Sequence, residues 1–454
     1  MSAAGLGWAG ILRLGLVQTA LGAVIVLTTS TLNRVMVVEF ALPAMLPGIL
    51  IVLKDVLQLA RPRFGHGSDV GGRRTPWIAG GMLVLAIGGL LAAVGTAMMG
   101  DSPATGFAVA VFAFLLIGLG VGAAGTNLLV LLARRVAAER RAAAAATVWI
   151  MMIAGFAITA GLAGHFLDPF SPERLVAVSA SVSALALCVT LLALRGIEDA
   201  PDLPEAAASP AGTPARMPFR AAFAEVWRES ESRRFTVFVF ISMLAYSAQD
   251  LILEPFAGRV FAMSPGESTR LAGLQHTGVL IGMLLVAAAG GLAGRGSARA
   301  GLRAWTVGGC VASALALAGV AMGAFFPEHW PLRATVFALG LGNGVFAVSA
   351  IASMMALAGH GQPRREGLRM GLWGAAQAIA MGAGAFGGTV AVDLARWLLP
   401  DAGLAYALVF GLEGLLFLMA ALIGATIVVR DEGGAPVRAP RFRDVALVEV
   451  LDAR

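Results

Sequence analysis

The first candidate functional residues of this chain are polar side chains at the end of a long apolar segment. Residues 12–38 are apolar for most of their length, and Asn33, Arg34 and Glu39 lie at the end of this run. Beside lipid, a charged side chain costs about 2.5–3.5 kcal/mol at the centre of a membrane helix. We therefore expect these three side chains to be buried, paired or engaged with a ligand.

A second polar group ends another apolar segment much later in the chain. It contains Gln249, Asp250 and Glu254, followed by Arg259. Asp250 and Glu254 are four residues apart and therefore share one face of a helix. Two interpretations are open: ion pairs with Arg34 and Arg259 that lock two halves together on the outer side, or a polar site for a ligand head group or ring.

Two further ionisable residues lie inside apolar segments. His276 falls within residues 270–294, and Glu413 within residues 402–429. A neutral imidazole can coordinate a metal ion, including the magnesium of a chlorophyll, although an interior histidine is more often held by a hydrogen bond. Beyond this possible ligand we expect no metal site and, because nucleophile and phosphate-loop motifs are missing, no catalytic residues.

The composition defines the solvent that surrounds these residues. Hydrophobic residues make up 58% of the 454 positions and charged residues 13%, against about 45–50% and about 25% in soluble proteins. A helix needs about 20 apolar residues to cross the bilayer, and such windows predict an all-α polytopic membrane protein with twelve transmembrane helices. The expected spans are residues 12–33, 40–60, 76–99, 106–133, 143–167, 173–195, 234–256, 270–294, 302–326, 332–358, 367–396 and 402–429.

The spans fall into two sets of six. A proline-rich segment follows the sixth span, and the glycine pattern of residues 118–122 recurs at residues 340–344. Internal repetition and a long linker are typical of the major facilitator fold. The expected organisation is an N-terminal half at residues 1–195, a cytoplasmic linker with a short amphipathic helix at 196–233, a C-terminal half at 234–429 and a cytoplasmic tail at 430–454.

The loop after the second span resembles the cytoplasmic gate motif of facilitators, although a merely solvated basic loop is the alternative. The matching residues are Gly65, Asp69, Gly72, Arg73 and Arg74. Two other facilitator motifs are missing, since Leu116 stands where proton-coupled members have an arginine and the fifth span lacks a Gly-Pro pair. These absences disfavour an ordinary ion-driven pump.

The distribution of basic residues predicts the orientation. Most of the 33 Lys and Arg residues lie in the termini and the even-numbered connections, which the positive-inside rule places in the cytoplasm. Both termini are therefore expected to be cytoplasmic. The basic residues sit in short loops, so the pI of about 10.4 does not indicate nucleic acid as a partner.

Several strings resemble the PucC/LhaA family of phototrophic bacteria, the bacteriochlorophyll delivery family of the major facilitator superfamily. They are residues 14–18, 28–39, 42–44 and 61–65, with Ser68 and Asp69. Residues 68–74 look more like the branch associated with bacteriochlorophyll synthase. Asn33, Arg34 and Glu39 are the candidate site residues that match the family signature.

The resemblance implies a non-enzymatic assembly factor that binds or delivers bacteriochlorophyll, or a late precursor, as cargo during biogenesis of light-harvesting complexes. It implies bacteriochlorophyll synthase and light-harvesting or reaction-centre polypeptides as partners, within the lipid of the bacterial inner, intracytoplasmic membrane. The alternatives are a secondary active transporter of a small amphipathic solute and a purely structural scaffold. A lipid-soluble pigment can enter from the membrane between two helices and needs no proton gradient. The absence of the proton-coupling motifs agrees with such a cargo.

Overall fold

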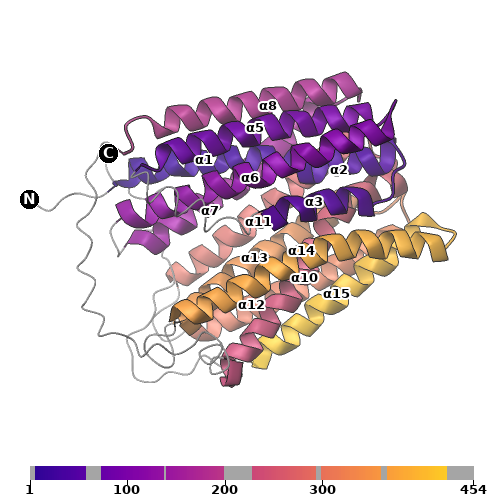
Figure 1. Ribbon diagram of the computed structural model, residues 1–454. Coiled ribbons are helices and arrows are strands. Elements are labelled where there is room, and N and C mark those ends of the chain that lie inside the picture. Colours follow the sequence, from indigo (N-terminus) through magenta and orange to yellow (C-terminus); the bar gives the residue numbers. More distant parts are fainter. Residues whose placement is uncertain are drawn as a thin grey trace, which may run out of the picture.

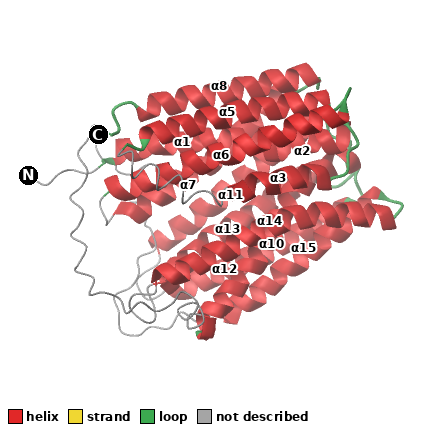
Figure 2. Cartoon of the chain, in the orientation of Figure 1, coloured by secondary structure: helices red, strands yellow, loops and turns green. Residues whose placement is uncertain are grey.

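The computed structural model of the chain describes residues 6–57, 73–136, 140–198, 227–292, 298–358 and 366–426. These residues form helices and loops, without a strand among them (Figures 1 and 2). Three of the predicted gate residues, Gly65, Asp69 and Gly72, lie outside the described ranges, as do most of the expected linker and the tail. The prediction of an all-α membrane protein is confirmed.

The helices follow the predicted spans closely. The N-terminal half contains α1 Trp8–Val26, α2 Leu32–Arg34, α3 Met45–Leu57, α5 Thr75–Met98, α6 Pro103–Arg135, α7 Arg141–Phe166 and α8 Pro172–Leu194. The C-terminal half contains α10 Ser230–Val260, α11 Pro265–Leu292, α12 Ala298–Gly323, α13 Leu332–Ala358, α14 Glu366–Leu398 and α15 Ala402–Thr426.

Eleven helices in the described ranges are long and apolar enough to cross a membrane. The remaining helix, α3, occupies the predicted second span and ends where that described range stops. Helices are the expected secondary structure in a lipid bilayer, because each helix pairs its backbone N–H and C=O groups internally.

The first span contains the whole apolar run of residues 12–38 and extends well beyond the narrower window of residues 12–33. It runs from Trp8 to Glu39 over 32 residues. The window ended at Asn33 and Arg34 because it treats polar residues as the membrane boundary. Both side chains are buried in the protein, with exposed fractions of 1% and 2%, so the helix continues past them.

Two π-helical segments interrupt this first span. They are η1 Leu27–Thr31 and η2 Val35–Glu39, on either side of α2. The wider turns loosen the usual backbone bonding, and the hydroxyls of Thr28 and Thr29 both donate to the carbonyl oxygen of Ile25, at 2.8 and 3.0 Å. Such segments are rare and frequently occur at functional sites. Here they coincide with the polar end of the span.

Each half has its own apolar core. The first core comes from α1 to α8, apart from Leu251 and Ala385, and the second comes from α10 to α15. The halves meet through α7 with α11, α3 with α14, and the end of the first span with α10. Glycine permits close approach of α7 and α11, because a Cβ atom at Gly273 of α11 would lie 2.8 Å from the backbone nitrogen of Gly161 in α7. The exact boundaries of the four predicted segments stay a prediction.

Candidate functional site

The polar end of the first span meets the end of α10 across the two halves. The Asn33 amide donates to the carbonyl oxygen of Leu251 at 2.6 Å. Arg34 donates to the carbonyl oxygen of Met263 at 2.5 Å, and Arg259 donates to that of Val37. The two polar groups identified in the sequence therefore lie together, joined by side chain to main chain hydrogen bonds.

Arg34 has a second partner within its own helix. Its guanidinium pairs with Glu39, whose side chain is 32% exposed. The guanidinium also packs against Gly258, where a Cβ atom would lie 2.9 Å from Nη2. Arg34 thus occupies a buried slot between the halves, and its own bond to the other half ends on a main-chain atom, the carbonyl oxygen of Met263.

Two more polar contacts join the halves at the same end of the bundle. Asp168, after α7, accepts from Arg270 at 2.8 Å and from the Ser264 hydroxyl at 2.5 Å. Asp393 of α14 accepts the backbone N–H groups of Ala44 and Met45 at 3.0 and 2.7 Å, and so caps the start of α3. This end lies away from the start of α1 in Figure 1 and carries the odd-numbered connections.

A polar cluster lies deeper in the membrane, between the halves. Asp250 of α10 interacts electrostatically with Lys54 of α3, with Glu413 of α15 and with Tyr246 one turn earlier. The Lys54 ammonium also lies 3.1 Å from the Asp55 carboxylate. At about 1.5 Å rise per residue, Lys54, Asp250 and Glu413 lie about 14–17 Å from the joined ends of their helices. That depth is close to the middle of a hydrocarbon layer about 30 Å thick.

Several side chains of this region are buried without hydrogen-bond partners in the described chain. Both carboxylate oxygens of Glu413 and of Glu254, and both polar amide atoms of Gln249, lack one. The residues are 3%, 3% and 0% exposed. Ser268 and Thr269 lie near Glu254, but their hydroxyls contact Pro265 and Thr31 instead. Unpaired buried polar groups are costly, and they point to a bound water or ligand.

Asp250 differs from these buried residues because it is exposed. Lys54, Glu413 and Tyr246 are its charged and polar neighbours. It is therefore the carboxylate of the cluster that a ligand between the halves can reach. The sequence pointed to Asp250 and Glu413 but not to Tyr246, which the spacing of four residues to Asp250 could have identified.

His276 lies at the same depth on α11. Its Nδ1 atom is 2.8 Å from the carbonyl oxygen of Ala272, and because a carbonyl only accepts, Nδ1 carries the hydrogen. In the neutral ring the lone pair is then on Nε2, which no residue in the described ranges contacts by a hydrogen bond. Phe156 of α7 packs edge-on against the ring, with centroids 5.1 Å apart. His276 is half-buried and lies at the face between the halves.

The described gate residues, Arg73 and Arg74, begin α5 and contact a carboxylate that the sequence analysis did not identify. Glu198 accepts the N–H groups of Arg74 and Thr75 at 2.6 and 3.1 Å, and lies 3.7 Å from Nε of Arg73. Burial opposes ionisation of Glu198, but these interactions outweigh it and hold its pKa below the ordinary value. Glu198 lies at the start of the predicted linker, more than 120 residues after Arg73. No sequence pattern connected the two residues.

The arrangement defines the class of protein. Two bundles of apolar helices with polar residues at mid-depth between them form a membrane protein of the major facilitator fold. A D-xylose-proton symporter has the same fold, with a TM-score of 0.68 over 93% of this chain and 98% of that one, at 14% sequence identity.

Within that class, a family model described as PUCC protein matches residues 31–432. The chain belongs to the PucC family. It is 52% identical over 436 residues to the "Bacteriochlorophyll synthase 44.5 kDa chain" of Rhodobacter capsulatus, covering 95% of this chain and 98% of that protein. It is 31% identical to "Protein PucC" of Cereibacter sphaeroides, over 90% of each chain. The resemblance drawn from residues 14–69 is confirmed.

Proposed function

We propose that this protein is a non-enzymatic assembly factor that binds bacteriochlorophyll, or a late precursor, and delivers it during biogenesis of light-harvesting or photosynthetic complexes. The observation that carries the proposal is His276, which offers the Nε2 lone pair at mid-depth between the halves. A tetrapyrrole magnesium accepts such a ligand, and the hydrogen bond from Nδ1 to Ala272 orients the ring as second-shell bonds do in metal sites. Membership of the PucC family supports the pigment as the cargo.

The surrounding residues suit a large flat ligand with a few polar substituents. Phe156 provides an aromatic edge beside His276. The Gln249 amide and the Tyr246 hydroxyl can donate hydrogen bonds to carbonyl groups at the edge of a macrocycle. Neither polar atom of the Gln249 amide has a hydrogen-bond partner in the part of the chain that the structure describes. A few placed polar groups in an otherwise apolar lining are typical of small-molecule sites.

The proposal assigns no catalytic role to these residues, although the relative at 52% identity carries a synthase name. Carboxylates, an amide, a tyrosine and a histidine at mid-depth can hold and orient a macrocycle without changing its bonds. Bacteriochlorophyll synthase and light-harvesting or reaction-centre polypeptides are the proposed partners for loading and delivery. The proposed location is the inner, intracytoplasmic membrane, with both termini in the cytoplasm.

Purification from a pigmented host in mild detergent tests this proposal. The wild-type protein is expected to retain bacteriochlorophyll, measured by absorption spectroscopy as pigment per protein. His276→Phe should lower this ratio or shift the long-wavelength band, because the axial ligand is lost. His165→Phe is the matched control, since His165 is exposed at the end of α7. Wild-type protein repeatedly free of pigment, or equal ratios in all three proteins, would refute the proposal.

A second candidate function is secondary transport of a small amphipathic solute. Asp250 favours it, because an exposed carboxylate at mid-depth faces Lys54 of the other half, at the position where transporters bind their substrates. This function requires substrate-dependent proton flux into vesicles that Asp250→Asn abolishes. Pigment retention without any such flux separates the two functions.

A further inference from the structure

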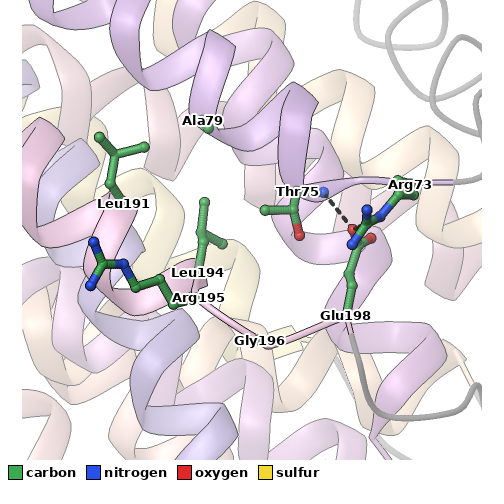
Figure 3. Close-up of a pocket in the computed structure, with 8 residues that line it drawn as sticks. All are labelled: Arg73, Thr75, Ala79, Leu191, Leu194, Arg195, Gly196 and Glu198. Carbon is green, nitrogen blue, oxygen red and sulfur yellow. Dashed lines mark hydrogen bonds and ion pairs between the residues drawn. The ribbon is translucent and has the colours of Figure 1, made fainter.

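A pocket of about 230 Å³ lies at the opposite end of the N-terminal half from the joined ends, between the start of α5 and the end of α8 (Figure 3). Its lining residues are Arg73, Thr75, Ala79, Leu191, Leu194, Arg195, Gly196 and Glu198. The distribution of Lys and Arg predicts that this end is cytoplasmic. The pocket is therefore expected at the level of the lipid head groups of the inner leaflet.

The turn from residue 195 to residue 198 concentrates positive charge around this pocket. Arg13 and Arg135 donate to the carbonyl oxygens of Arg195 and Glu198, the latter at 3.3 Å. Arg73 is 69% exposed beside Glu198, and Arg195 is exposed at the other side of the pocket (Figure 3). Glu198 already accepts two backbone N–H groups, and the Arg195 guanidinium lies away from it, on the other side of the pocket (Figure 3).

The positive charge adjoins an apolar, exposed surface of α8. Leu191 and Leu192 are 47% and 58% exposed, and Figure 3 shows Leu191 beside the Arg195 side chain. On a membrane helix, exposed leucines contact lipid chains. Gly196 has φ of 66°, a conformation that glycine adopts readily, and this turn ends α8 with Arg195 at its rim.

We propose that this surface binds the phosphate group of an anionic phospholipid, with the phosphate on Arg195 and an acyl chain along Leu191 and Leu192. A guanidinium donates two parallel hydrogen bonds to phosphate oxygens, and basic pockets at the cytoplasmic ends of membrane helices bind anionic head groups. The Arg13 guanidinium, which donates to the Arg195 carbonyl oxygen, adds positive potential beside it. This site lies apart from the pigment site, and its occupancy does not depend on pigment binding.

Native mass spectrometry of the full chain tests the proposal. Purified protein is mixed with phosphatidylglycerol, with phosphatidylcholine or with inorganic phosphate, and the retained adducts are counted. Phosphatidylglycerol is expected to be retained in preference to phosphatidylcholine. Arg195→Gln should weaken its binding about tenfold, the effect of losing one charge-assisted hydrogen-bonding group. Arg174→Gln is the matched control, because Arg174 is exposed at the opposite end of the same helix.

Three further measurements distinguish a phospholipid from free phosphate and test whether the variants remain folded. If inorganic phosphate displaces phosphatidylglycerol at millimolar concentration, the site recognises phosphate alone and the acyl contact is refuted. Leu191→Ser separates the same two cases, since it should weaken only lipid binding. Unchanged melting temperatures for the variants establish that the fold is retained. Equal retention of both lipids, or equal binding by wild type and Arg195→Gln, would overturn the proposal.

Discussion

Arg34 offers the sharpest test of how the two halves are held together. Arg34→Met keeps an unbranched side chain of similar length and removes the charge from a residue that is 2% exposed. The carbonyl of Met263 loses a charged donor, which is worth about 1.5–3 kcal/mol. Glu39 loses its partner, but its side chain is 32% exposed, so water replaces much of that interaction and the loss adds at most about 1 kcal/mol. The expected fall in the free energy of unfolding is about 1.5–4 kcal/mol.

The assay is reversible unfolding in mixed micelles, followed by tryptophan fluorescence as the fraction of denaturing detergent rises. Arg333→Met is the control, because Arg333 is 68% exposed and lies 4.0 Å from Glu267. Loss of the Arg333 charge is expected to change the free energy of unfolding by no more than about 0.5 kcal/mol. A cycle with Glu39→Gln then isolates the pair. A fall below about 1 kcal/mol for Arg34→Met would refute the reasoning, since that is the value of a solvated surface pair.

Two further predictions concern helix starts. Glu198→Gln should destabilise the protein by about 1 kcal/mol through the weaker cap on α5. Because the pKa of Glu198 is lowered in the folded protein, its contribution is fully present above the ordinary value of about 4.3 and is lost as the pH falls below that value. Thermal unfolding between about pH 6 and about pH 3 should therefore show a flatter pH dependence in the variant. Asp393→Ala should weaken the cap on α3 by about 0.5–2 kcal/mol and speed hydrogen exchange of the first amides of α3. Asp401→Ala, which removes a local cap at Leu404, should leave α3 unchanged. Equal exchange of these amides in both variants would contradict the assignment.

The tertiary structure explains why some sequence predictions stopped short. The window of residues 12–33 omitted the end of the first span because Arg34 and Asn33 are polar, whereas the apolar run of residues 12–38 included both, and the two side chains are buried. The two π-helical segments also left no sequence signal. In η1, the Thr28 and Thr29 hydroxyls bond to Ile25, and such weak local contacts are available in any helix.

The sequence by itself determined the membrane class, the approximate position of nearly every span and the identity of the costly intramembrane residues. These are local properties, because an apolar window of about 20 residues crosses the bilayer whatever its neighbours do. Only the tertiary structure decided that Arg34 bonds to Met263, that Phe156 packs on His276, and that Asp250 faces Lys54. Each of these contacts joins residues far apart in the chain, and the side chain that a helix face meets is set by how the two halves pack.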